Sequence, residues 1–182
     1  DLMDDEAKRE IALIASFDED EIGSRMTTNY IHVHTGLNVK AAMKELIAQA
    51  AEHDNISKIY VVDEHHTFYG AIDLKDLIIA RENTSIEDIL VTSYPYFYAH
   101  EPIERSIEKM KDYSEDSIPV LDPNNKLLGV LRSQDMVEIV DDEMSEDYAK
   151  LAGLSAEEDL KEPVTKSMRK RLPWLLILLG LG

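Results

Sequence analysis

In the middle of the chain, short apolar runs alternate in a regular order with segments whose apolar residues have helical spacing. Residues 31–33 and 59–62 are short apolar runs of the kind that form buried strands. Between them, apolar residues return at helical spacing behind Asn38, a residue type that caps helix N-termini. This stripe consists of Val39, Ala42, Met43, Leu46, Ile47 and Ala50. A polar turn, another strand and a helix start follow, so the pattern predicts strand, helix, strand, strand and helix.

The same order returns further along the chain. Residues 96–98 predict a strand, and Pro102 suits the first turn of the helix that follows. The apolar stripe of that helix is Ile103, Ile107 and Met110. Residues 59–77 align without a gap on residues 118–136, at a constant offset of 59. The aligned pairs include Val61 with Val120, Asp63 with Asp122, Gly70 with Gly129 and Asp76 with Asp135. We therefore predict an α+β fold of two β-α-β-β-α units, at about residues 25–86 and 87–144.

Both flanks of the repeated region differ from it. Residues 1–20 have helical spacing, with Ala7, Ile11 and Ile14 on one side, and we assign residues 1–24 to the end of a preceding helical domain and a linker. Beyond the repeats, residues 155–158 form a capping box, which predicts a further short helix after Gly153.

The C-terminal end combines basic and apolar residues. Its basic cluster is Lys166, Arg169, Lys170 and Arg171. Trp174 and a run of aliphatic residues follow, and this order is typical of a cytoplasmic segment that enters a membrane. Residues 174–182 are too few to cross a bilayer, which takes about 20 residues. The run is either a truncated first transmembrane helix, which we favour, or a short tail that packs on the domain or on a second copy.

Composition narrows the choice of partners. The 182-residue chain carries a formal net charge of −18, which argues against nucleic acid as a partner, since phosphate binding needs a basic surface. The charge favours cations or a basic partner surface. The chain has no cysteine, so disulfides, thiolate metal sites and thiol nucleophiles are excluded.

One acidic segment stands out, at residues 135–147. It contains seven carboxylates and no Lys or Arg. Its apolar residues keep helical spacing at Met136, Val140, Met144 and Tyr148, while Asp135, Glu138, Asp142 and Glu146 form a second, negative stripe. Because like charges at helical neighbour positions repel by about 0.2–0.5 kcal/mol per pair, such a helix favours a bound cation. Carboxylate oxygens prefer Mg²⁺ or Ca²⁺, although a solvated acidic face is the simpler interpretation of a charge run alone.

Other chemistry-bearing residues form no catalytic group. His32 and His34 lie two apart on a predicted strand, which permits a metal pair, but a surface or half-buried strand is the favoured interpretation because no third ligand is evident. Ser133 is interpreted as the N-cap of the acidic helix rather than as a nucleophile. The chain also lacks a phosphate-binding glycine loop. We therefore predict that it is not an enzyme.

The repeat resembles the CBS domain, and two in tandem resemble a CBS pair. Residues 17–30, in which Gly23 precedes Met-Thr-Thr, resemble the junction into the CBS pair of MgtE-type magnesium transporters. The region from Glu162 to Leu178 resembles the connecting plug helix of that family, so residues 145–182 would be an acidic linker and this helix. The resemblance implies a homodimeric, multi-pass membrane channel whose part at the cytoplasmic face binds Mg²⁺ and then closes the pore.

Residue roles follow from this resemblance by position. The implied Mg²⁺ ligands are Asp135, Glu138, Glu143, Glu146, Asp147 and Glu104. The family has an Asp where this chain has Ser114, which is a departure from the pattern. Many CBS pairs bind adenine nucleotides through Thr or Ser three residues before an Asp, but Asp73 and Arg132 stand at those positions here. Asp76 is thus the nucleotide contact of an alternative function, an adenine-nucleotide-sensing CBS module.

Overall fold

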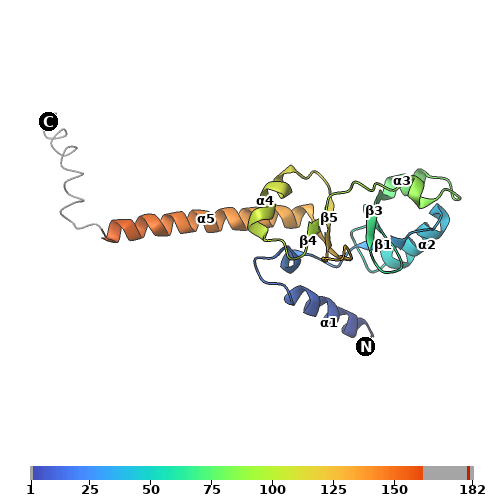
Figure 1. The fold of residues 1–182 in the computed structure, drawn as a ribbon, viewed down its shortest axis with the longest axis horizontal. Coiled ribbons are helices and arrows are strands. Elements are labelled where there is room, and N and C mark those ends of the chain that lie inside the picture. The colour runs from blue at the N-terminus through green and yellow to red at the C-terminus, as the bar shows by residue number, and fades with distance from the viewer. Residues whose placement is uncertain (1, 162–179, 181–182) are drawn as a thin grey trace. The chain divides into compact units, whose positions relative to one another are not determined.

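The computed structural model describes residues 2–161 and residue 180, and it divides at Val140/Asp141 into two compact units. The first unit holds two small mixed sheets with their helices (Figure 1). Its first half contains α1 (Leu2–Ala15), η1 (Ile22–Arg25), β1 (Ile31–His34), α2 (Val39–Ala50), β2 (Lys58–Val62), β3 (Phe68–Asp73) and α3 (Leu74–Ile79). Its second half contains η2 (Ile86–Asp88), β4 (Phe97–Tyr98), α4 (Ile103–Asp112), β5 (Ser117–Leu121) and β6 (Leu127–Arg132), and α5 (Ser133–Lys161) follows.

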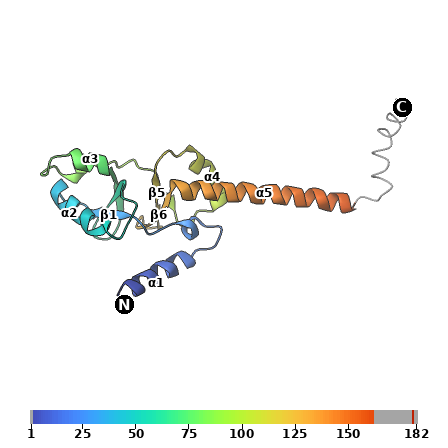
Figure 2. The same cartoon turned by 180° about the vertical axis from the view of Figure 1, so that it is seen from behind.

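Each sheet has three strands in the same order. In the first sheet β2 lies between β1, its parallel neighbour, and β3, its antiparallel neighbour. The parallel pair needs a crossover, which α2 supplies, and α2 lies beside β1 in both views (Figures 1 and 2). The second sheet repeats this arrangement with β4, β5 and β6. The predicted tandem pair of β-α-β-β-α units is therefore confirmed.

The repeat extends to the register of the hairpins. Val61 pairs with Gly70 in the first sheet, and Val120 pairs with Gly129 in the second. Each hairpin then shifts register at the next residue, between Val61 and Val62 and again between Val120 and Leu121. These positions keep the offset of 59 read from the sequence, so the alignment of the two copies is correct at single-residue resolution.

Local signals fix the helix starts. The side chain of Asn38 accepts a hydrogen bond from the amide of Ala41 at 2.8 Å, which confirms the predicted cap of α2. Pro102 precedes the first residue of α4. At α5, Ser133 is the first helical residue rather than the residue before it. Helix α5 also continues to Lys161 without a break, so the predicted separate helix after Gly153 is wrong.

Three apolar clusters hold the first unit together. One lies within the first repeat, around Val33, Leu46 and Ile72. A second lies within the second repeat and also takes residues from the segment before β1, Ile22 and Met26 among them. The third cluster joins the two sheets. It consists of Tyr30, Tyr60, Val62, Ala71, Tyr94, Leu121, Leu127 and Val130.

The two repeats exchange their leading segments. Thr27, ahead of the first sheet, exchanges both backbone hydrogen bonds with Val130 of the second. Val91, ahead of the second sheet, does the same with Ala71 of the first. Gly70 and Gly129 make this possible, because a Cβ on either would collide with a carbonyl oxygen of the segment that crosses it. Each repeat is thus covered by backbone that belongs to the other.

Candidate functional site

The acidic helix begins with an ion pair rather than with a free carboxylate. The side chain of Asp135 accepts hydrogen bonds from Arg132 Nε at 3.0 Å and Nη2 at 3.1 Å, and also from the Arg132 backbone amide at 3.0 Å. This is the geometry of a residue that caps a helix N-terminus from three positions inside it. The hydrogen bond to Asp135 raises the pKa of the Arg132 guanidinium. Asp135 therefore has a protein cation as its partner, which the sequence analysis missed.

The first two turns of α5 separate an apolar face from an acidic one. Met136 and Ile139 are buried in the core of the second repeat, while Glu138 is exposed. Glu104, on the first turn of α4, is exposed as well. The packing of the helices thus leaves both carboxylates at the surface.

The second unit carries the other predicted ligands. Glu143, Glu146 and Asp147 lie at positions i, i+3 and i+4 of α5, which places them on one helix face. Glu143 is half-buried, and Glu146 and Asp147 are exposed. Such hard, anionic oxygen donors fit Mg²⁺ in kind. Among the residues that the structure describes, however, no three His, Asp or Glu side chains are already arranged around a common metal position. The six predicted ligands stay a prediction.

The candidate nucleotide residue lies on α3, just after an aspartate that is paired with a lysine. Asp76 is half-buried on the first turn of α3. Asp73, just before that helix, forms an ion pair with Lys58, and the Lys58 ammonium also lies 3.1 Å from Glu115 and 5.4 Å from the centre of the Tyr94 ring. The charge of Asp73 is therefore balanced locally. A cavity of about 140 Å³ adjoins this group; it is lined by Lys58, Ala71, Asp73, Val91, Tyr94 and Glu115.

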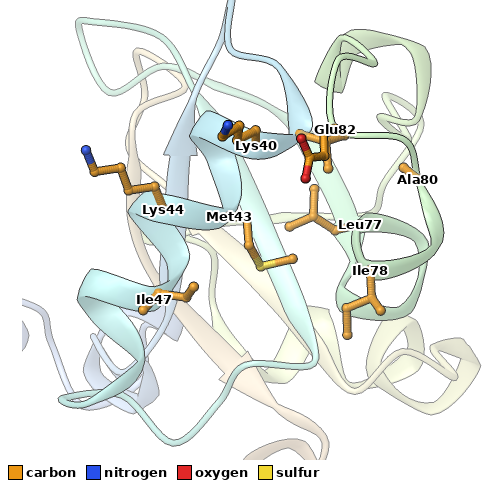
Figure 3. Close-up of a pocket in the computed structure, with 9 residues that line it drawn as sticks. Lys40, Met43, Lys44, Ile47, Leu77, Ile78, Ala80 and Glu82 are labelled. Carbon is orange, nitrogen blue, oxygen red and sulfur yellow. The ribbon is translucent and has the colours of Figure 1, made fainter.

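A larger pocket of about 460 Å³ lies between α2 and α3 of the first repeat. Met43 and Leu77 point into it, and Lys40 and Lys44 stand along its α2 side (Figure 3). Ile47 and Ile78 line it as well, although both side chains are mostly exposed. Exposed isoleucines around an apolar hollow are typical of a surface that contacts another protein.

Comparison with known families bears on the repeated architecture. The model of the CBS domain matches residues 20–83 and again residues 86–142. The chain belongs to the CBS domain family. Its two copies form a CBS pair, and this membership confirms the prediction that the chain is not an enzyme.

Relatives over nearly the whole chain confirm the finer resemblance as well. The magnesium transporter MgtE of Enterococcus faecalis is 35% identical over 95% of this chain, and that of Thermus thermophilus is 30% identical over 100%. The chain spans only 38% and 41% of the length of these two proteins. It is thus similar to one region of MgtE-type transporters, and this region is a regulatory CBS pair.

Solved structures agree with this assignment. The CBS pair matches the soluble part of a magnesium transporter with a TM-score of 0.67 and 30% identity, over 71% of this chain and 51% of the other. The cytosolic domain of the Mg²⁺ channel MgtE in complex with ATP gives the same TM-score and identity, over 72% and 53%. In the described part of this chain, no helix combines the length and apolar character that a membrane span requires. The predicted connecting helix and the basic cluster lie outside the described residues.

Proposed function

We propose that this CBS pair is the Mg²⁺-sensing region of a magnesium transporter, at the cytoplasmic face of the cell membrane, and that Mg²⁺ bound to its carboxylates acts on a pore domain of the same protein. The observation that carries the proposal is the row of acidic side chains on α5, in a chain whose relatives are magnesium transporters. The residues proposed as ligands are Glu138, Glu143, Glu146, Asp147 and Glu104, with Asp135 as a further ligand only if it leaves Arg132.

The physical basis is repulsion that a divalent cation removes. Glu143 and Glu146 are helical neighbours with the same charge, and Asp147 is next to both. Mg²⁺ loses its water reluctantly and is commonly held by one or two carboxylates and several waters. Exposed carboxylates that need not converge on one point suit such a hydrated ion. Binding would favour the arrangement of the protein in which these oxygens are brought together, by the difference in affinity between the two arrangements.

Neutralising the carboxylates of the second unit tests this proposal. In the wild type, Mg²⁺ at ten times its dissociation constant should raise the free energy of unfolding by about 1.4 kcal/mol. The variant with Glu143→Gln, Glu146→Gln and Asp147→Asn should lose this gain, because it lacks the carboxylate oxygens that are proposed to bind Mg²⁺. Thermal unfolding of the 182-residue chain with and without MgCl₂, at constant ionic strength, measures the difference.

A matched variant controls for net charge. Glu52→Gln, Glu64→Gln and Asp54→Asn likewise remove two Glu and one Asp carboxylate, all three exposed, from the first repeat. This variant should keep the response of the wild type. An equal Mg²⁺ response in both variants would contradict a site on α5, since it would reduce the effect to general screening of the charge of −18.

We also propose that the region acts as a homodimer, with the apolar face of α2 and α3 in contact with the same face of a second copy. A twofold contact uses one patch twice, and this patch is apolar at its centre around the pocket. Ile78→Glu should shift the chain towards monomer by tenfold or more in dissociation constant, because it buries a charge in that contact, at a cost of about 1.4 kcal/mol or more. Sedimentation equilibrium measures the shift.

Ile11→Glu is the control for this second test. Ile11 is as exposed as Ile78, at 68% against 62%, but it lies on α1. This substitution should leave the dissociation constant unchanged. If Ile78→Glu does so as well, the α2–α3 face is not the dimer contact.

Adenine-nucleotide sensing is the second candidate function. One observation favours it: the cytosolic domain of the Mg²⁺ channel MgtE, 30% identical to this chain, has been solved in complex with ATP. The residue proposed to contact the nucleotide is Asp76, on the first turn of α3. Equilibrium dialysis distinguishes the candidates. ATP binding that Asp76→Asn abolishes, in a chain whose stability does not respond to Mg²⁺, would favour this alternative.

A further inference from the structure

A cluster of histidines lies on one side of the first sheet. His32 and His34 point to the same side of β1, and His66 comes from the turn between β2 and β3. The ring of His32 lies 4.9 Å from that of His66 and 5.7 Å from that of His34, both in edge-to-face contact. Three imidazoles thus share one small region of the surface.

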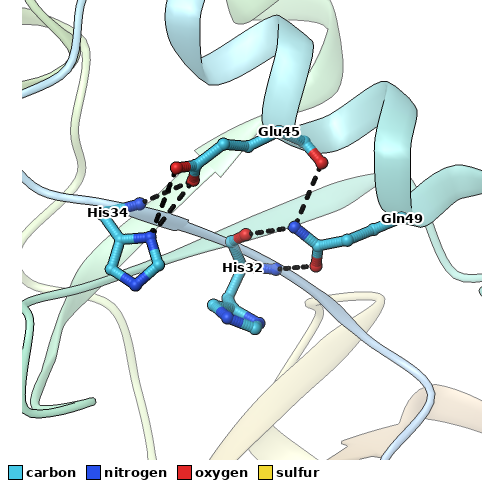
Figure 4. Close-up of polar contacts among 4 residues, drawn as sticks. All are labelled: His32, His34, Glu45 and Gln49. Atoms are coloured by element: carbon cyan, nitrogen blue, oxygen red, sulfur yellow. Dashed lines mark hydrogen bonds and ion pairs between the residues drawn. The ribbon is translucent and has the colours of Figure 1, made fainter.

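The backbone of His32 is fixed to α2 from both sides. Its amide donates to Gln49 Oε1 at 3.1 Å, and its carbonyl accepts from Gln49 Nε2 at 2.7 Å (Figure 4). The neighbouring His34 has an anionic partner, because its ring nitrogen lies 3.3 Å from a carboxylate oxygen of Glu45. His34 therefore has a carboxylate beside its ring, whereas His32 has Gln49 on its backbone and other imidazoles around its ring.

His66 links the cluster to the second repeat. Its Nε2 lies 3.2 Å from the hydroxyl of Tyr30, a residue of the apolar cluster between the sheets. Its carbonyl accepts a hydrogen bond from the amide of Leu127 at 3.1 Å, and the Phe68 amide donates to Asn125 at 2.9 Å. The turn that carries His66 is thus part of the contact between the repeats.

The second repeat provides a neutral version of the same arrangement. His66 has a φ of 65°, and its counterpart at the offset of 59 is Asn125, with a φ of 64°. The sheet register pairs Val33 with Val61 and Phe97 with Val120, so Tyr96 and Tyr98 are the counterparts of His32 and His34. The left-handed turn and the strand therefore form without histidine, and the fold itself does not require imidazoles at these positions.

We propose that protonation of the His32–His66 pair is an acid-sensitive device that releases the contact between the two CBS repeats. A proton on each ring would place two positive charges in half-buried rings whose centres are 4.9 Å apart, where water screens the charges poorly. His66 belongs to the contact between the repeats, whereas the backbone of His32 is fixed to α2. The repulsion is therefore relieved when the turn that carries His66 moves away from His32.

The surrounding charges support this direction. Burial, with His66 and His34 as further causes, lowers the pKa of His32 to about 4. Burial, with His34 next, also lowers the pKa of His66. The groups that face His32 are His34, Glu45 and His53, of which only Glu45 favours the proton. Around His66, the interaction of the ring with the Leu127 backbone and the charge of Asp63 favour the proton, and Lys126 opposes it.

The sign of the pH dependence follows. An unfolded or released histidine has a pKa of about 6.5, so between pH 6.5 and about 4 the released form binds protons that the closed form does not. The closed contact is fully stable above pH 6.5 and loses stability as the pH falls through this window. A shift of one unit corresponds to a tenfold change in the equilibrium.

Hydrogen exchange at the contact tests the proposal. From pH 7 to pH 5, after correction for intrinsic rates, the protection of the Leu127 and Phe68 amides in the 182-residue chain should fall by about tenfold relative to the Val120 amide of β5. The variant with His32→Gln and His66→Asn should lose this fall. The second substitution installs the residue that the other repeat has at this φ, so the turn should keep its shape.

A control and a second measurement make the result decisive. His65→Asn removes an exposed histidine from the same turn and should behave as the wild type. In urea unfolding between pH 7 and 5, the wild type should take up about one proton more on unfolding than the double variant. The proposal is overturned if the protection of Leu127 and Phe68 stays constant in the wild type, or if the double variant shows the same fall.

Discussion

Truncation of Ile139 to alanine should lower the free energy of unfolding of the CBS pair by about 3 kcal/mol. Ile139 lies on the first turns of α5 with only 1% of its surface exposed, in the core of the second repeat. The substitution removes buried methyl and methylene groups and leaves a cavity, and the two costs add. Urea denaturation followed by far-ultraviolet circular dichroism measures the loss.

Val137 provides a control two residues away on the same helix. Its side chain is 61% exposed, so Val137→Ala should change the free energy of unfolding by at most about 0.5 kcal/mol. Similar losses in both variants would mean that α5 is not anchored by the face that carries Met136 and Ile139. The acidic face would then not be held in the orientation on which the proposed Mg²⁺ ligand Glu138 depends.

Replacement of Gly70 by alanine should destabilise the chain by about 2–3 kcal/mol. A Cβ at this position of β3 would collide with the carbonyl oxygen of Val91 and lie 2.9 Å from Leu90 Cδ1. The first of these is backbone, which is tied to Ala71 by two hydrogen bonds, so it cannot move aside without breaking them. Thermal unfolding of the variant measures this cost.

The control for Gly70 is another glycine-to-alanine change. Apart from its own helix backbone and chain neighbours, a Cβ on Gly153 would meet no atom of the described residues within 4 Å, and this residue lies inside α5. Gly153→Ala should therefore be neutral or stabilise the helix by up to about 1 kcal/mol. If Gly70→Ala is equally harmless, the leading segment of the second repeat is not held as tightly over β3 as its hydrogen bonds indicate.

Much of the fold was predictable because the same pattern of residues occurs twice in the sequence. A single pattern of strand, helix, strand, strand and helix is ambiguous, but its return at an offset of 59 fixes the register, and the pairs Val61–Gly70 and Val120–Gly129 confirm it. Asn38 was predictable as a cap because capping is local chemistry within four residues.

Two features of α5 were predicted wrongly or missed. Ser155 and Gly153 resemble a helix start after a stop, yet α5 passes through them, because one glycine costs a helix only about 1 kcal/mol. The ion pair of Asp135 with Arg132 was not predicted, although an acidic residue three positions into a helix is a recognisable capping signal. Asp135 was predicted as a Mg²⁺ ligand, and Arg132 only as a departure from the nucleotide-binding pattern.

In the candidate sites, contacts between residues far apart in the sequence could not be predicted from the order of the residues alone. Lys58 and Glu115 meet beside Asp73 only because the two sheets contact each other, and nothing near Lys58 in the sequence indicates this. The same holds for His32 and His66, which are 34 residues apart and come together through the pairing of β1 with β2. Helix periodicity, in contrast, was sufficient to place Glu138, Asp142 and Glu146 on one stripe of α5, whereas Glu143 and Asp147 followed from the family resemblance alone.

The crossing of Thr27 over the second sheet and of Val91 over the first has a consequence for how such a chain could arise. In a protein with only one of these repeats, the strand that contains Gly70 or Gly129 would lack the segment that crosses it. The segment ahead of the first strand would in turn have no second sheet to pair with. Two identical half-length molecules could form a dimer by exchanging these segments. The tandem chain makes this exchange within one molecule, because its two repeats are covalently joined.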